Sequence, residues 1–155
     1  MAATRSPWRW LARGAVVLGA GGGLGLALAW TERLPEGPVP VAWDREACAH
    51  CRMHVGEPAF AAQLQLADGR VLNFDDPGCL LRYEAEARPA VHAAWFRHVR
   101  EDRWIPGARV AFVQVSPTPM GYGVGAVEAG APGARAPAEV LAGMTGMREG
   151  REGTP

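Results

Sequence analysis

The chain has 155 residues and a formal net charge of +0, and it contains 20 glycines, 13 prolines and 3 cysteines. The neutral charge balance argues against a nucleic-acid partner, because nucleic-acid-binding domains carry a basic excess. The length allows one domain, and the glycines and prolines indicate short elements with many turns. With an odd number of cysteines, at least one thiol must stay free, bind a metal or pair with another chain. A purely structural set of disulfides is therefore disfavoured.

Residues 1–30 have the composition of an export signal or a membrane anchor. Arg5, Arg9 and Arg13 precede a stretch without charge, residues 14–29. As a helix, residues 11–29 would span about 29 Å, close to the ~30 Å hydrocarbon thickness of a bilayer. Tryptophans bracket this span, which favours retention, whereas Ala27-Leu28-Ala29 would also allow cleavage. We expect the rest of the chain on the extracytoplasmic, periplasmic side, anchored to the inner membrane by residues 11–29.

The proline-rich segment 31–40 predicts an extended linker. We expect the folded domain at residues 41–143 and a disordered tail at 144–155. Alternation of apolar and polar residues predicts a half-buried strand at 60–66. Asp68-Gly69 then predicts a two-residue hairpin turn, which leads into a second strand at 70–74.

Asp75-Asp76-Pro77 has the features of a helix start, because a carboxylate can cap the first turn and proline fits the first helical position. The predicted helix runs to about Ala87. Further strands are predicted at 93–100, 109–115 and 124–127, and a short helix at 137–142. The sequence therefore predicts a small α+β domain.

Soft donor side chains are concentrated in one stretch, Cys48-Ala49-His50-Cys51-Arg52-Met53-His54. Thiolate and thioether sulfur favour Cu(I), so a C-x-x-C motif followed by methionine indicates monovalent copper before zinc. Cys48, His50, Cys51 and Met53 are therefore candidate metal ligands.

Two other interpretations of the C-x-x-C motif remain open. A thiol-disulfide oxidoreductase would use Cys48 and Cys51 as attacking and resolving thiols, but residues 55–58 do not continue as the helix that such a motif opens. A zinc-stabilised interaction module would need four ligands, which Cys48, Cys51, Cys79 and a histidine could supply.

Cys79 falls in the first turn of the predicted helix, where the dipole would lower the pKa of an exposed thiol. The favoured interpretation of Cys79 is nevertheless a small buried side chain, because cysteine is among the residue types most often buried.

Three motifs, in this order, resemble the nitrous-oxide reductase accessory proteins of the NosL type. They are Cys51-Arg52-Met53, Phe74-Asp75-Asp76-Pro77-Gly78-Cys79 and Thr118-Pro119-Met120-Gly121-Tyr122-Gly123. The similarity covers about residues 41–127. It implies a fold of two similar ββαβ units and the role of an exported Cu(I) chaperone in denitrification, not an enzyme.

The resemblance also implies partners and ligands. The partners would be a copper-accepting protein, nitrous-oxide reductase, and a copper-supplying transporter. Cys51 and Met53 would ligate Cu(I), and Met120, which the residues alone would place as a core side chain, becomes the candidate third ligand. Three departures from the family are visible: Arg52 replaces the usual glycine, the lipid-anchored cysteine is missing, and the predicted second helix is short and broken by glycine. Cys48 is present in only some relatives.

Overall fold

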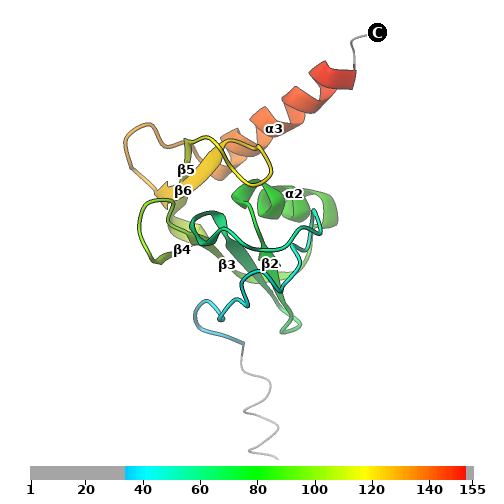
Figure 1. The fold of residues 1–155 in the computed structure, drawn as a ribbon, viewed down its shortest axis with the longest axis vertical. Coiled ribbons are helices and arrows are strands. Elements are labelled where there is room, and N and C mark those ends of the chain that lie inside the picture. Colours follow the sequence, from blue (N-terminus) through cyan, green and yellow to red (C-terminus); the bar gives the residue numbers. More distant parts are fainter. Residues whose placement is uncertain (1–33, 153–155) are drawn as a thin grey trace, which may run out of the picture. The chain divides into compact units, whose positions relative to one another are not determined.

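The structure is a computed structural model that describes residues 34–152, with side chains described up to Met144. The expected signal or anchor, residues 1–30, lies outside this range. Between residues 34 and 152 no helix is both long enough and apolar enough to cross a membrane. The described part is an α+β domain, as the sequence predicts (Figure 1).

The strands form two antiparallel sheets. One sheet has the strand order β2-β1-β3-β4, and the other pairs β5 with β6. The elements in chain order are η1 (Pro58–Phe60), β1 (Ala62–Leu66), β2 (Val71–Phe74), α2 (Pro77–Ala87), β3 (Val91–Arg97), β4 (Trp104–Pro106), η2 (Gly107–Arg109), β5 (Val110–Gln114), β6 (Val124–Glu128) and α3 (Pro137–Glu152).

The order ββαβ is complete in the first half of the domain, where β1, β2, α2 and β3 follow one another. In the second half, β5 and β6 are followed by α3. No strand follows α3 within the residues that the structure describes.

The hairpin of β1 and β2 lies where the sequence predicts it, but its turn contains three residues instead of two. The backbone N–H of Leu66 donates to the carbonyl of Arg70 at 2.9 Å, and that of Gly69 donates to the carbonyl of Leu66 at 3.0 Å. Gly69 closes the turn with a φ of +87°. Because glycine has no Cβ, it reaches this region without a steric penalty, and three-residue hairpins commonly end on such a residue.

Helix α2 begins and ends where the sequence predicts. The side chain of Asp76 accepts a hydrogen bond from the Gly78 N–H at 2.8 Å, and Pro77 occupies the first helical position. At the other end, Arg88 takes a left-handed conformation with φ of +45°. The local signals at Asp76-Pro77 were therefore sufficient to locate this element.

Three later elements differ from expectation. β3 ends at Arg97, not at residue 100, because the His98 N–H pairs with the carbonyl of Arg103 at 2.9 Å and turns the chain back. β4, which follows this turn, was not expected. α3 runs to Glu152 instead of ending at residue 142, and so extends into the segment expected to be a disordered tail. Its Met144 is only 7% exposed, so packing supports the longer helix.

Strand β1 is buried on both faces, although its alternating pattern predicts one solvent-facing side. Gln63 and Gln65 are 0% and 1% exposed. Gln63 exchanges two hydrogen bonds with the backbone of Val39, at 2.8 and 3.0 Å, and Gln65 donates to the carbonyl of Gly37 at 2.6 Å. Part of the expected linker therefore lies against the sheet and supplies hydrogen bonds to both of these buried amides.

An apolar core joins the two sheets and both helices. Phe96 of β3 and Phe112 of β5 meet edge to face, with ring centroids 5.4 Å apart. α2 packs against β1, β2 and β6, and α3 packs against β5 and α2 (Figure 1). Cys48 and Cys79 are members of this core. The packing therefore fixes both the loop that carries Cys48 and the start of α2.

Candidate metal centre

A closed loop, residues 47–54, carries the C-x-x-C motif. Its two ends pair as an antiparallel bridge. Inside it, the Cys48 N–H donates to the carbonyl of Met53 at 2.7 Å, and the Arg52 N–H donates to the carbonyl of Cys48 at 3.1 Å. Arg52 has a φ of +68°, in the left-handed region. The motif therefore lies on a tight turn and does not open a helix.

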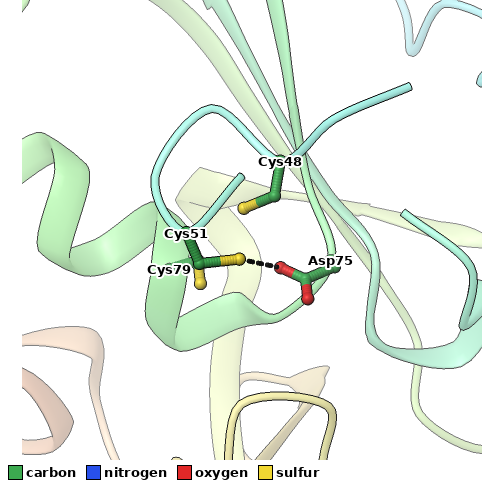
Figure 2. Close-up of side chains that lie close together, drawn as sticks. All are labelled: Cys48, Cys51, Asp75 and Cys79. Atoms are coloured by element: carbon green, nitrogen blue, oxygen red, sulfur yellow. Dashed lines mark hydrogen bonds between the residues drawn. The ribbon is translucent and has the colours of Figure 1, made fainter. Parts of the chain in front are cut away.

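The loop is attached to β2, and β2 leads directly to two further donor side chains. The Ala49 N–H donates to the carbonyl of Asn73, in β2, at 2.9 Å. Asp75 follows the last residue of β2, and Cys79 lies in the first turn of α2. The loop, the strand end and the helix thus bring donors from three segments together (Figure 2).

Cys48, Cys51, Asp75 and Cys79 form a group that could hold a metal ion. One sulfur or oxygen atom from each lies within 4.8 Å of the corresponding atoms of the others. The Cys51 thiol donates to Asp75 Oδ1 at 3.2 Å (Figure 2), and the cysteines form no disulfide. Three sulfurs and one oxygen are a ligand set that thiophilic ions accept.

The group is largely shielded from water. Cys48 and Cys79 are 0% exposed and Asp75 is 3% exposed, whereas Cys51 is only partly buried. A carboxylate placed among buried sulfurs is costly unless hydrogen bonds or a cation compensate it. A bound cation would provide that compensation, and Cys51 marks the side from which it is reached.

The pKa values of the three thiols differ because hydrogen bonds within the group and burial affect each thiol differently. Hydrogen bonds from the Cys79 thiol and the Cys51 N–H lower the pKa of Cys48 to about 6, although burial opposes them. Burial raises the pKa of Cys51 to about 12. The hydrogen bond to Cys48, followed by burial, raises the pKa of Cys79. Cys48 is therefore the most acidic thiol of the group.

The other predicted ligands lie outside this four-residue group. Met53 is 60% exposed and Met120 is 36% exposed. The ring of His50 directs Nε2 to Glu86 at 3.3 Å and is not part of the group. Of the predicted ligands, Cys48 and Cys51 are brought together, and Cys79, considered for the zinc alternative, joins them.

One feature of the site differs from the sequence interpretation. Asp75 was interpreted only as part of a helix start, although it lies in a motif that also contains Cys79; that spacing was the available signal. Cys79 lies at the start of α2 and is fully buried, which confirms the favoured interpretation of a small buried side chain. Its hydrogen bond to Cys48, followed by burial, raises its pKa, so the exposed, acidic thiol of the other interpretation is wrong.

The loop that carries Met120 is held against the start of α2. The Met120 N–H donates to Asp76 Oδ2 at 3.2 Å. The ring of Tyr122 lies so close to Gly78 that a Cβ on residue 78 would overlap it. This loop therefore has a fixed position beside the segment that supplies Asp75 and Cys79.

No protein-family model, no curated protein and no solved structure matches this chain. The similarity to NosL-type proteins stays a prediction from three short motifs. The residues of the site itself are the basis for the functional proposal.

Proposed function

We propose that this protein is a metal carrier, which binds one Cu(I) through its clustered cysteines and passes it to a partner protein. The observation that carries the proposal is the convergence of Cys48, Cys51 and Cys79 within 4.8 Å. Thiolates are among the ligands that select Cu(I). The ion is the cargo of this protein, and no catalysed reaction is part of the proposal.

A carrier needs an accessible edge, because a partner must reach the ion to exchange ligands with it. Cys51 is the partly exposed member of the group, and Met53 follows two residues later with 60% of its surface exposed. A thioether is a soft donor that can contact Cu(I) while a thiolate is being replaced. We assign the transfer step to this edge.

The turn after Cys51 supports the proposed relationship to NosL-type chaperones. That family usually has glycine where this chain has Arg52, and Arg52 adopts a φ of +68°. Glycine reaches this region without steric cost, whereas another residue pays about 1–2 kcal/mol. The backbone of this turn therefore has the conformation that explains a family preference for glycine.

The same relationship supplies the rest of the proposal. The client is nitrous-oxide reductase, the supplier is a copper transporter, and residues 11–29 hold the exported domain at the inner membrane. The resemblance also implies a second ββαβ unit, of which the described residues contain β5, β6 and α3. Each of these statements depends on the resemblance, whereas copper binding depends on the site.

The test is an anaerobic Cu(I) titration in competition with a chelator, followed by transfer to a metal-free acceptor protein. We expect one Cu(I) per chain, and a loss of affinity in Cys51→Ser, Cys48→Ser and Cys79→Ser. Met53→Leu preserves side-chain volume and should mainly slow transfer, and Met120→Leu should slow it less. A wild-type protein that cannot compete for Cu(I) would refute the carrier.

The oxidoreductase alternative has less support from the same geometry. Its attacking thiol should be both exposed and acidic. Here the acidic thiol, Cys48, is fully buried, while the partly exposed thiol, Cys51, has a raised pKa. Reduction of insulin by the wild type, with equal loss in Cys48→Ser and Cys51→Ser, would favour this alternative.

A zinc-stabilised module is the second candidate, because Asp75 adds an oxygen donor that zinc accepts. In that case zinc would co-purify with the protein, and its removal would unfold the domain.

A further inference from the structure

The donors of the four-residue group are unequal, since three are sulfur atoms and one is a carboxylate oxygen. We propose that Asp75 is the residue by which the site discriminates between ions. It joins the thiolates as fourth ligand of a divalent ion such as Zn(II), and it stays outside the ligand shell of Cu(I). This inference rests on the proposed function, and it adds a second class of ion with a different coordination.

The position of Asp75 suits a fourth ligand. Its side chain is 3% exposed, and its Oδ1 lies 3.2 Å from the Cys51 sulfur. In a tetrahedral zinc site with Zn–S bonds of about 2.3 Å, neighbouring sulfurs lie roughly 3.8 Å apart. The donor atoms of the group already lie within 4.8 Å of one another. Only a small contraction would close a site of three sulfurs and one oxygen.

The neighbouring carboxylate shows that this role is specific to Asp75. Asp76 is also buried, but its two oxygens accept the backbone N–H groups of Gly78 and Met120, at 2.8 and 3.2 Å. Asp75 instead faces a thiol whose proton a bound metal would displace. Its oxygen then becomes available to the ion.

The charges of Zn(II) and Cu(I) give one reason why the site should bind them with different ligands. Zn(II) carries one positive charge more than Cu(I), so it offsets one more of the four anionic donors in this buried site. Each uncompensated charge there is costly. Cu(I) also prefers sulfur to a hard carboxylate oxygen. Cu(I) therefore uses the thiolates alone, and its open coordination suits transfer, whereas a closed four-ligand zinc site has no position for an incoming ligand.

The test compares Asp75→Asn with Asp76→Asn in the full-length, reduced protein, using Zn(II) alone and Cu(I) alone in chelator competition. Asp76→Asn is the charge-matched control, because it removes the same charge one residue away and its side-chain oxygen still caps the helix; it gives up only the second acceptor, which binds the Met120 N–H. We expect the two variants to bind Cu(I) equally. For Zn(II), Asp75→Asn should be weaker than Asp76→Asn by at least about tenfold, the scale seen when a supporting group of a metal site is lost.

Equal zinc affinities in the two variants, or a loss in Asp75→Asn that is the same for both metals, would overturn the discrimination while leaving the carrier intact. Absence of Cu(I) binding by the wild type would refute the carrier instead. A measurement on the wild type covers the case in which Asp75→Asn fails to fold. X-ray absorption should show three sulfurs and one oxygen around zinc, and only sulfur around copper. A zinc shell without oxygen would refute the role of Asp75.

Discussion

At the scale of single residues, Cys48 is the one thiol of the group whose pKa is lowered. It is fully buried, yet it receives hydrogen bonds from the Cys79 thiol and the Cys51 N–H. These two donors stabilise a thiolate inside the core. Of the three sulfurs, that of Cys48 therefore loses its proton most readily, and it is the first to offer a negative charge to a cation.

This asymmetry predicts a titration in two separate stages. A thiol is neutral below its pKa and anionic above it, so the ultraviolet absorbance of thiolate should rise by one group per chain as the pH passes about 6, the pKa of Cys48. The thiolates of Cys51 and Cys79 should form only at strongly alkaline pH, because both pKa values are raised. In Cys48→Ser the first stage should disappear. A metal-free wild type with no thiolate at neutral pH would contradict this prediction.

Metal binding should depend on pH in the corresponding direction. The thiols of Cys51 and Cys79 must lose protons before they can ligate. Affinity should therefore rise as the pH rises and fall as the medium becomes more acidic.

At the scale of elements, the start of α2 and the loop before β6 fit each other through Gly78 and Tyr122. A Cβ on Gly78 would overlap Cδ2, Cγ and Cβ of Tyr122, which lie near the ring's attachment and cannot swing aside freely. A glycine in the first turn of α2 is thus required by its neighbour and not by the helix.

We therefore expect Gly78→Ala to destabilise the protein by about 1–3 kcal/mol, the usual cost of overpacking. Gly143→Ala in α3 is the matched control, since a Cβ there would meet no atom within 4 Å. Because alanine favours helix more than glycine does, that variant should gain up to about 1 kcal/mol. Urea denaturation of both variants measures the difference. Equal changes in the free energy of unfolding in the two variants would show that the Tyr122 side chain can move away from residue 78 without loss of stability.

Elements with strong local signals were predictable from the sequence, and those set by distant contacts were not. Asp68-Gly69 located the first hairpin, and Asp76-Pro77 located α2. β4 has only three residues, too few for a periodic pattern, and it exists because it pairs with β3. The polar face of β1 was expected in solvent, but residues 37–39 cover it. No periodicity in β1 itself could have revealed that.

At the scale of the whole molecule, the domain has a core that does not depend on a metal. The apolar residues of both sheets and both helices form one continuous cluster. The metal site lies at one edge of this cluster and shares Cys48 and Cys79 with it. A bound ion should therefore add stability to a fold that is already formed.

We expect Cu(I) or Zn(II) at a free concentration of about 100 times Kd to stabilise the protein by ~2.7 kcal/mol, as binding to the folded state alone requires. Thermal unfolding under reducing conditions measures this as a rise in Tm. The rise should be smaller in Cys79→Ser. Chelation should lower the Tm to that of the metal-free protein without unfolding it at room temperature. Unfolding by the chelator would instead indicate a structural zinc site.

The candidate site could be predicted only in part, because its residues are brought together by contacts between distant segments of the molecule. The pair Cys48 and Cys51 is visible in the sequence because its members are three residues apart. Cys79 was considered beside Cys48 and Cys51 only as a ligand in the zinc alternative, and Asp75 only as a helix-start residue. Their convergence requires the hairpin to return the chain to the loop, where the Ala49 N–H meets Asn73. Such a closure depends on tertiary pairing, so no local pattern contains it.

That closure has a mechanical consequence. An ion held by both Cys48 and Cys79 would act as a clasp that encloses β1 and β2 in a ring of covalent and coordinate bonds. The enclosed stretch, fully extended, measures on the order of 100 Å. When a pulling force unfolds the loaded protein, this length would stay closed until the clasp opened, whereas the empty protein would release it as soon as the domain unfolds. Loading would thus shorten the molecule's extensible contour without changing its resting fold.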